Sequence, residues 1–332
     1  QEGDHWVVRL EDRRTGKTRE VSARMLVKAA GPWVDMVSSH ISGVSIPPRV
    51  RLVKGSHIVV KKLFDHDRCY FFQNSDGRIF FAIPYEGDYT LIGTTDLDYT
   101  GDPSDVAINS DEISYLLDGA NDYLAEEVTR DQVVWAYSGV RPLYDDGASS
   151  AQEATRDYIL KIETGTGEPP LLNIYGGKLT TYRRLAEHVV DKCDTALGRE
   201  SKPWTAGAAL PGGDFDVDGF AQQVDRLRAA YAFLPQQTAE RLVRAYGTLV
   251  PRVLGEAKTL ADLGEDFGGG LTGAEVDYLI ANEWAESVED ILWRRSKLGL
   301  KLGERDIKAL THYLEARRAS DAANGVDEGD ET

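Results

Sequence analysis

The sequence contains little cysteine and has a deficit of positive charge. Its 332 residues include two cysteines, and 55 acidic residues against 38 basic ones give a formal net charge of -17. Cys69 and Cys193 are far apart and have no metal-ligand spacing, which fits a reducing compartment without a disulfide framework. We expect both to act as small apolar side chains. Broad contact with nucleic acid needs a surplus of Lys and Arg, so no nucleic-acid partner is expected.

Several motifs are also missing. No apolar stretch of about 18 residues could span a bilayer, and no H-E-x-x-H or C-x-x-C pair indicates a metal site. The sequence has neither a G-x-G-x-x-G fingerprint after a strand nor a Walker loop. We therefore expect no metal site and no complete nucleotide-binding βαβ unit within these residues. Peripheral membrane association remains open.

What the sequence does contain begins as part of a sheet. Residues 6–10 and 21–25 read as the strands of a hairpin, and a short apolar strand at 25–27 leads into Ala29-Ala30-Gly31-Pro32. A strand that ends in small residues and glycine is typical of a doubly wound sheet where a ligand approaches the backbone. Pro32 suits the first turn of a helix. Residues 1–50 therefore look like the remnant of such a domain.

Residues 51–141 have a different pattern. Short runs of β-branched and aromatic residues alternate with turn residues, which predicts an antiparallel sheet. Asn109 and Glu112 resemble a capping box and predict a helix after them. The expected strands are 56–60, 69–72, 78–83, 89–92 and 132–137.

The rest of the chain predicts an α+β protein with a separate helical end. Residues 142–198 return to the first domain, with strands at 158–162 and 171–174 before a helix. Residues 199–325 are expected to form an all-α domain, and Thr272 with Glu275 resembles a second capping box. The composition from 319 onward predicts a disordered acidic end, with 326–332 as a tail. The expected helices are 217–231, 236–246, 272–298 and 303–318.

Gly176-Gly177 carries the strongest local signal, because a strand runs into it and a helix follows. The helix N-terminus has free N–H groups and a favourable dipole for anionic ligand atoms, and Lys178 adds positive charge. Apolar residues repeat at helical spacing: Leu179, Tyr182, Leu185, Ala186, Val189, Val190 and Cys193. An ordinary strand-to-helix turn is the alternative.

Two arginines and one histidine are further candidates. Arg141 ends a strand and Arg156 begins another, so together they can clamp a phosphate. Surface ion pairs with Asp145, Asp146 or Asp157 are the alternative. His57 stands beside a glycine turn on an apolar strand, as a catalytic base or as a structural residue. The hydroxyls of Gly93-Thr94-Thr95-Asp96 either bind a ligand or build a turn.

Together these blocks resemble FAD-dependent glycerol-3-phosphate dehydrogenases of the D-amino-acid-oxidase-like flavoprotein superfamily. The family's fingerprint glycines would lie upstream of residue 1, and Lys28 stands where the family usually has asparagine. The matching stretches follow the family's order: Ala30–Val34, Arg51–Val60, Leu91–Asp96, Tyr137–Leu143, Thr155–Tyr158, Gly176–Arg183, Leu210–Gly213, Asp262–Gly268 and Leu292–Arg295.

The resemblance implies a reaction and a cofactor. FAD would accept a hydride from C2 of sn-glycerol 3-phosphate, giving dihydroxyacetone phosphate, and the electrons would pass to a quinone. His57 would assist deprotonation of the C2 hydroxyl, and Arg141 would join it in catalysis. Arg141, Arg156 and Lys178 would bind the substrate phosphate. The residues expected at the cofactor are Ala30, Gly31, Gly176, Gly177, Lys178, Leu179, Thr180 and Thr181.

The resemblance also implies a location and leaves alternatives. The enzyme would be cytoplasmic and peripheral on the inner face of the cytoplasmic membrane. A glycerol-3-phosphate oxidase that uses oxygen would share these residues, whereas the two arginines together with Lys178 disfavour an amino-acid oxidase. Because the fingerprint glycines are absent, we expect this chain alone to bind FAD weakly or not at all and to be inactive. It would then be a non-catalytic folded fragment. We expect it to self-associate through an exposed strand edge, with a homodimer as one such assembly.

Overall fold

The computed structural model describes residues 3–13, 15–41, 50–145, 157–163 and 168–324. The chain divides into two compact units, Gln1–Ala206 and Gly207–Thr332. This division lies beyond the predicted boundary after residue 198. The reason is a pair of bonds from helix α3 (Tyr182–Leu197) to the linker, in which Arg183 donates to Thr205 Oγ1 and Glu187 accepts from that hydroxyl.

The first unit contains a three-stranded sheet that joins distant parts of the chain. Strand β3 (Leu26–Lys28) runs parallel to β11 (Leu171–Tyr175), and β10 (Ile159–Glu163) pairs antiparallel with β11. The hairpin of β1 (Trp6–Glu11) and β2 (Thr18–Ala23) precedes it. After β3 come a 3-10 turn at Gly31–Trp33 and α1 (Val34–Ser39), as Pro32 predicts. The short apolar runs are thus strands, as expected.

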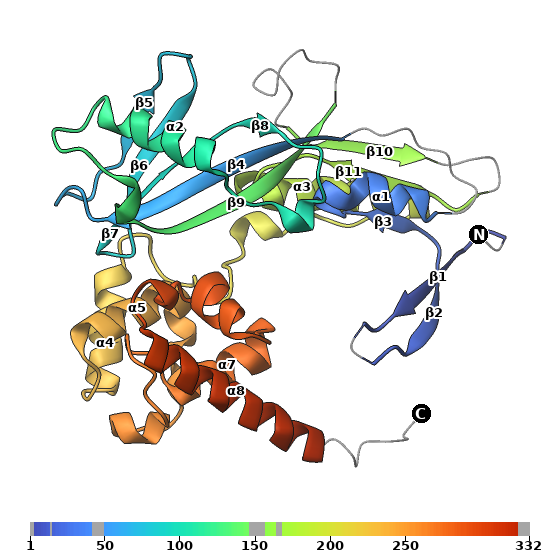
Figure 1. The fold of residues 1–332 in the computed structure, drawn as a ribbon. Helices are drawn as coiled ribbons and strands as arrows, with labels where there is room; N and C mark the ends of the chain where they lie inside the picture. The colour runs from blue at the N-terminus through green and yellow to red at the C-terminus, as the bar shows by residue number, and fades with distance from the viewer. Residues whose placement is uncertain (1–2, 14, 42–49, 146–156, 164–167, 325–332) are drawn as a thin grey trace. The chain divides into compact units, whose positions relative to one another are not determined.

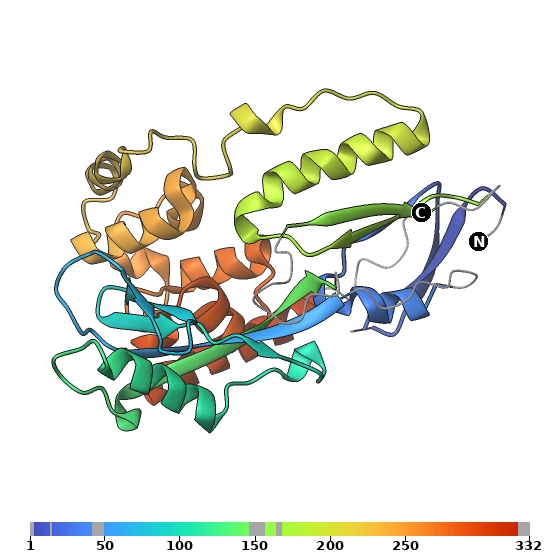
Figure 2. The same ribbon diagram turned by 90° about the horizontal axis from the view of Figure 1, so that it is seen from above.

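Helix α3 (Tyr182–Leu197) follows β11 and lies along this sheet (Figure 2). A 3-10 turn at Leu179–Thr181 separates the glycines from it, so the α-helix begins later than the sequence suggested. Tyr158 Oη, next to β10, lies 2.6 Å from His188 Nδ1 on the helix. The predicted apolar stripe is not a buried one, because this fully described helix has no buried residue and Leu179 is 88% exposed.

The second sheet of the first unit is antiparallel, as predicted, and is built around the long strand β4 (Val50–Lys61) (Figure 1). One side of β4 pairs with β9 (Val133–Tyr144), and the other side pairs with β7 (Tyr89–Gly93) and with β8 (Leu97–Asp98). Beyond β7 lie β6 (Ile79–Tyr85) and the outermost strand β5 (Tyr70–Gln73). β4 and β9 extend beyond the predicted strands 56–60 and 132–137. Polar residues in the added segments have partners within the fold: Lys54 pairs with Glu112, and Arg141 pairs with Asp96.

Helix α2 (Ser110–Asn121) covers one face of this sheet (Figure 1). Its capping box is confirmed: the Asn109 side chain accepts from Glu112 N at 2.9 Å, and Glu112 Oε2 accepts from Asn109 N at 3.0 Å. The helix and sheet share one apolar core of Ile58, Val60, Phe72, Phe80, Ala82, Ile92, Leu116, Leu117, Ala120 and Val128.

The second unit is helical, as predicted. Its core is made mainly of leucine, valine and aromatic residues from all of its longer helices. Those helices are α4 (Phe220–Ala230), α5 (Gln236–Tyr246), α6 (Val250–Leu254), α7 (Gly273–Glu283) and α8 (Glu304–Asn324). Short 3-10 turns in the two units span Pro103–Asp105, Arg130–Gln132, Thr205–Gly207, Gly247–Leu249, Leu260–Leu263 and Leu298–Leu300.

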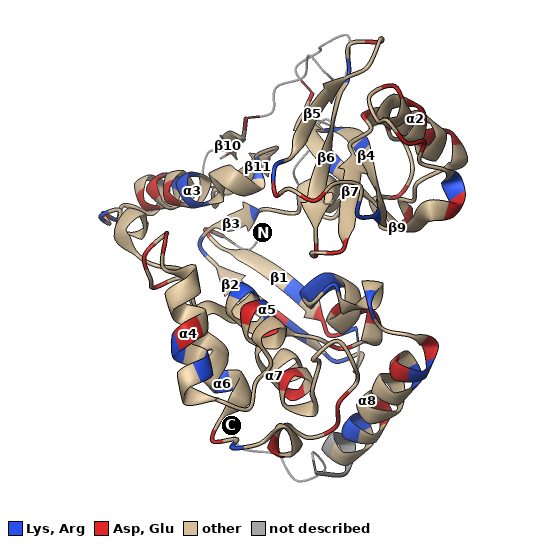
Figure 3. Ribbon diagram, turned by 90° about the vertical axis from the view of Figure 1, so that its left-hand side faces the viewer, with Lys and Arg blue, Asp and Glu red and all other residues tan. Residues whose placement is uncertain are grey.

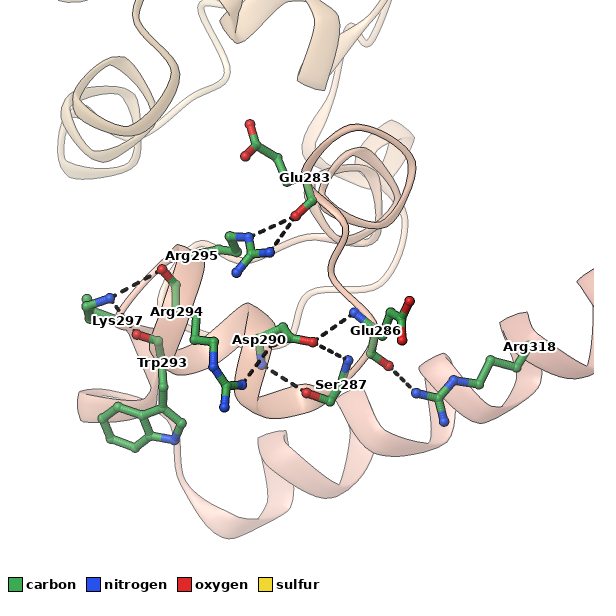
Figure 4. A network of polar contacts seen from close by, with 9 residues as sticks. All are labelled: Glu283, Glu286, Ser287, Asp290, Trp293, Arg294, Arg295, Lys297 and Arg318. Atoms are coloured by element: carbon green, nitrogen blue, oxygen red, sulfur yellow. Dashed lines mark hydrogen bonds and ion pairs between the residues drawn. The ribbon is translucent and has the colours of Figure 1, made fainter. Parts of the chain in front are cut away.

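The prediction of one helix over 272–298 is wrong. Helix α7 ends at Glu283 because Trp284 adopts a left-handed conformation (φ 52°), and a π-helix (Asp290–Arg295) follows after a break. Charged side chains cap both sides of the break (Figure 4). Arg295 donates two hydrogen bonds to the carbonyl of Glu283, at 2.9 and 2.6 Å, and Asp290 Oδ2 accepts from the backbone of Glu286 and Ser287.

The second predicted capping box, Thr272 with Glu275, does not form. No side-chain bond caps α7 at Thr272. Glu275 is 1% exposed and instead accepts from Arg241 Nη1 at 2.7 Å and Nη2 at 2.6 Å, and from Tyr246 Oη at 2.8 Å. The Glu275 carboxylate thus pairs with Arg241, which is distant in sequence, and does not cap the helix as the local pattern predicted.

Two smaller predictions also change. Cys69 is exposed and lies before β5, so it is not a buried apolar residue, while Cys193 is partly buried. Helix α8 continues to Asn324, so 319–324 are helical rather than disordered. Residues 325–332 lie outside the described part of the chain.

Candidate functional site

The candidate site occupies the face of the antiparallel sheet opposite α2. Side chains alternate along a strand, so Ser56 points toward α2 while Gly55 and His57 point the other way. Ser56 Oγ lies 2.7 Å from Glu112 Oε1 of α2, which fixes this assignment. On the neighbouring strand β9, Tyr137 pairs directly with His57. Tyr137 and Arg141, four residues apart, therefore share the face of His57.

His57 lies flat against Tyr137, with ring centroids 4.9 Å apart and an interplanar angle of 7°. A glycine on the other neighbouring strand makes room for the imidazole, since a Cβ at Gly93 would lie 2.3 Å from His57 Cδ2. His57 Nδ1 is buried and has no hydrogen-bond partner among the described residues. Burial, and then the charge of Arg141, lower the pKa of His57 to about 4. The ring is therefore neutral near pH 7 and able to accept a proton.

Arg141 is held by the turn after β7. Its Nη1 lies 2.7 Å from Asp96 Oδ1, and its Nη2 donates to Thr94 Oγ1 at 3.1 Å. The partner of Arg141 that the structure describes is thus Asp96, whereas Asp146 and Arg156 lie outside the described residues. The arginine side chain remains 31% exposed, so part of its charge can reach an anionic ligand. The threonines of this turn therefore act by holding the turn and the arginine.

A pair of glycines allows the guanidinium to lie on the sheet. Gly55 and Gly139 are direct cross-strand partners. A Cβ at Gly55 would lie 2.5 Å from Arg141 Nη1, whereas a Cβ at Gly139 would meet nothing within 4 Å. Only the glycine on β4 is thus required by the position of the arginine.

We expect Gly55→Ala to displace Arg141 and Gly139→Ala to leave it in place. The displaced guanidinium would lose its bonds to the 94–96 turn, and charged hydrogen bonds contribute about 1.5–3 kcal/mol each. Isothermal titration with inorganic phosphate measures the result. Phosphate affinity should fall about tenfold for Gly55→Ala, and equal affinities for the two variants would contradict the assignment.

The two glycine turns meet at one edge of the three-stranded sheet. Because β3 and β11 run parallel and in register, with Asn173 opposite Lys28, Ala30-Gly31 and Gly176-Gly177 leave the sheet at the same end. All three glycines have a positive φ: 53° at Gly31, 66° at Gly176 and 98° at Gly177. Ligands of open α/β sheets bind at the carboxyl ends of the parallel strands.

The Gly176 turn also lies against the antiparallel sheet. A Cβ at Gly176 would lie 2.9 Å from the carbonyl of Asp157 and 3.7 Å from the carbonyl of Pro142, the residue after Arg141. The Asp157 carbonyl therefore leaves no room for a side chain at Gly176, and the end of β9 lies within van der Waals distance of it. The structure brings the glycine turn and the arginine strand together, although they are distant in sequence.

The residues after the glycines are exposed. Lys178, Leu179 and Thr180 face solvent, and Thr181 Oγ1 donates to the carbonyl of Lys178 at 3.0 Å. Backbone groups here are accessible to a ligand at the same edge. Arg156, the second predicted arginine, lies outside the described residues.

Lys28, the departure from the family pattern, is buried. It is 3% exposed, donates to Ser38 Oγ of α1, and lies 5.9 Å from the ring centroid of Tyr175. Burial lowers the pKa of Lys28, while Asp35 and Glu163 act in the opposite direction. The lysine thus links β3 to α1 rather than reaching the glycine turn.

Sequence reasoning missed three members of this site. Tyr137 stacks on His57, Asp96 holds Arg141, and Glu112 lies beneath the turn that carries Asp96. The spacing of Tyr137 and Arg141 on a single strand could have indicated a shared face. The other two contacts cross between elements and have no local signal.

No group of three or more His, Cys, Asp or Glu within the described residues is arranged to hold a metal ion. Among the described helices, none combines the length and the apolar character needed to cross a membrane.

Comparison with known proteins gives matches to both units. Residues 1–183 match the family of FAD-dependent oxidoreductases, and residues 204–318 match the C-terminal domain of alpha-glycerophosphate oxidase. A solved glycerol-3-phosphate dehydrogenase from Bacillus halodurans, complexed with FAD, is similar with a TM-score of 0.75 and 28% identity, over 95% of this chain and 66% of that one.

Three relatives are similar in sequence over nearly the whole chain. Glycerol-3-phosphate dehydrogenase of Pseudomonas aeruginosa is 44% identical over 94% of this chain and 60% of its own length. Aerobic glycerol-3-phosphate dehydrogenase of Escherichia coli is 43% identical over 95% and 62%. D-erythritol 1-phosphate dehydrogenase of Brucella abortus is 41% identical over 95% and 62%. The chain thus spans about three fifths of the length of these relatives.

Proposed function

Because the chain belongs to the family of FAD-dependent oxidoreductases, we propose that it forms the substrate sheet and a flavin-edge turn of an enzyme that oxidises sn-glycerol 3-phosphate. The product is dihydroxyacetone phosphate. One observation carries the proposal: a buried, neutral imidazole and a partly exposed guanidinium lie on one face of the same sheet. The imidazole can accept the proton of an alcohol, and the guanidinium can bind a phosphate.

The residues at the glycine edge fit the isoalloxazine side of FAD. Ala30, Gly31, Gly176 and Gly177 would hold it, since their turns leave one sheet edge and their glycines admit a ligand close to the backbone. Lys178, Leu179, Thr180 and Thr181, which follow in an exposed turn, would complete the contact. When bound, FAD supplies the acceptor for the hydride that leaves C2 of the substrate.

The chain's own side chains perform the acid–base and binding steps. His57 accepts the proton of the C2 hydroxyl as the C2–H bond breaks, because its imidazole is neutral at physiological pH. Arg141 binds the phosphate through the part of its guanidinium that Asp96 and Thr94 leave accessible. Lys178 and Arg156 are the further cations proposed for the phosphate. Fixing the phosphate orients C2, and orientation lowers the barrier.

We expect Arg141→Ala to lower kcat/KM for glycerol 3-phosphate by about tenfold to a hundredfold in the flavin-loaded enzyme. Each lost charged hydrogen bond is worth about 1.5–3 kcal/mol. Steady-state kinetics with an artificial electron acceptor measures this, and Arg184→Ala on the exposed side of α3 is the matched control. Unchanged kinetics would show that Arg141 does not bind the phosphate, and no turnover by the wild-type enzyme once it is loaded with flavin would contradict the proposed function.

A second substrate is supported by one observation. The D-erythritol 1-phosphate dehydrogenase is nearly as similar to this chain as the glycerol-3-phosphate dehydrogenases are. Both compounds present a phosphate to bind and an alcohol to oxidise. Comparing kcat/KM for the two phosphates in the same assay decides between them.

The electron acceptor proposed is a quinone, with oxygen as the alternative. The family of the second unit is named for an oxidase, so peroxide formation by the flavin-loaded enzyme is the distinguishing measurement. A quinone lies in the bilayer, so we also propose peripheral contact on the inner face of the cytoplasmic membrane.

The charges of α3 do not form a purely basic surface of the kind that would bind an anionic membrane. Figure 3 shows basic and acidic residues together on the helix. Arg183 pairs with Glu187 at 2.9 Å, so it is partly neutralised within its own helix. A homodimer stays a prediction.

A further inference from the structure

A buried carboxylate lies on the side of the sheet opposite the site. Glu112, in the first turn of α2, is 3% exposed. Its Oε1 accepts from Ser56 Oγ at 2.7 Å and from Thr95 Oγ1 at 2.9 Å, and its Oε2 pairs with Lys54 Nζ at 2.7 Å. Burial alone would raise the pKa of Glu112, but the bonds from Lys54, Ser56, Asn109 and Thr95 outweigh it and lower the pKa. The carboxylate is therefore ionised.

This carboxylate is bonded to the turn that holds Arg141. Thr95 is 1% exposed, and its hydroxyl also accepts from Ser56 N at 2.9 Å, while Thr95 N donates to the carbonyl of Ser56 at 3.2 Å. The neighbours of Thr95 on either side, Thr94 and Asp96, carry the two oxygens that bind the guanidinium. The Thr95 side chain points toward α2, whereas the side chains of Thr94 and Asp96 lie on the face of the sheet that carries Arg141.

We infer that Glu112 is a positioning residue for the substrate phosphate: by fixing Thr95 from beneath the sheet, it fixes the turn that aims Arg141. The inference rests on the proposed function, since it assumes that Arg141 binds the phosphate. Glu112 touches neither His57 nor Arg141 through any bond that the structure describes. Its direct bond to the 94–96 turn is the one from the Thr95 hydroxyl, which makes that hydroxyl the place to test it.

Thr95→Val tests the link with little change of shape. Valine removes the hydroxyl that joins Glu112 to the turn, so Arg141 should lose its fixed aim. In the flavin-loaded enzyme, KM for glycerol 3-phosphate should rise about tenfold, as expected for one weakened charged hydrogen bond, with kcat changed much less. Thr95→Ser keeps the hydroxyl and should restore the wild-type KM. Glu112→Gln should resemble Thr95→Val where it folds, because an amide cannot accept all four bonds.

Ser138→Ala is the matched control. Ser138 Oγ lies 2.8 Å from Ser56 Oγ, so its loss disturbs the same buried network. It is bonded neither to Glu112 nor to the 94–96 turn in the described structure, so KM should stay unchanged.

A measurement without flavin separates this inference from the proposed function. The groups facing His57 include Arg141, whose charge contributes to its low pKa, and Tyr137. If Arg141 moves away in Thr95→Val, the His57 pKa, followed by NMR of the imidazole, should rise from about 4. A raised pKa without turnover in the wild type would support the positioning and reject the substrate. A folded Thr95→Val with unchanged KM and unchanged His57 titration would overturn the inference.

Discussion

His57→Asn is expected to lower kcat for glycerol 3-phosphate by about 10²–10⁴-fold, the usual contribution of a positioned general base. Asparagine keeps a polar group near the sheet but cannot take up the proton. Flavin content should be unchanged, since the glycine turns lie on other strands. His66→Asn is the control, because His66 is exposed and bonds Tyr70 outside the site. Equal kcat for both variants would make His57 a structural residue.

The pH dependence gives the same assignment a second test. The pKa of His57 in the folded protein is about 4, below its ordinary value of 6.5. The activity should therefore hold at neutral pH and fall on acidification toward about 4. Between pH 6.5 and about 4, His57 is protonated in the unfolded chain but stays neutral in the folded chain. The free energy of unfolding therefore keeps its full value above pH 6.5 and decreases as the pH falls from 6.5 through about 4. His57→Asn should abolish this decrease.

The second large effect concerns stability in the helical unit. Glu275→Ala is expected to cost about 3–5 kcal/mol, because it leaves the half-buried Arg241 without its bidentate partner. Burial, and then Glu275 itself, raise the pKa of Tyr246, so the phenol stays neutral and also loses its acceptor. Urea unfolding, monitored for this unit, measures the cost.

A matched control comes from an exposed ion pair. Glu256 and Lys258 are both largely exposed and lie 3.9 Å apart, so Glu256→Ala should change stability very little. A cost for Glu275→Ala no larger than that of the control would show that the buried pair is not needed. Replacing Arg241 and Glu275 together by apolar residues should recover much of the loss.

Local chemistry predicted the elements better than their ends. The period-two runs gave the strands of both sheets, and Asn109 with Glu112 gave the start of α2, because these signals act over a few residues. The same capping pattern failed at Thr272, since Arg241 lies on another helix and no local pattern reveals it. The break at Trp284 was missed for a similar reason: a non-glycine residue in a left-handed conformation is held there by its surroundings.

The site followed the same rule. Motif resemblance predicted His57, Arg141 and the glycine turns, and the structure places the first two on one face of a sheet. The partners of Arg141 were not predicted, because Asp96 is separated from it by 45 residues of chain. Aspartates near in sequence were the natural expectation, but pairing across the sheet depends on strand order. Resemblance to the dehydrogenases is confirmed by the family match and by the relatives.

The alternation along β4 limits how this protein can change in evolution. Odd-numbered positions carry Gly55 and His57 toward the substrate face, and even-numbered Lys54 and Ser56 meet the carboxylate of α2. Inserting or deleting one residue before Lys54 would exchange the two faces for the residues on one side of the change, unless a bulge absorbed it. The imidazole would enter an apolar core, and a lysine would occupy the site. Substitutions in this segment can be tested by selection one at a time, but its length is fixed by the two faces that it serves.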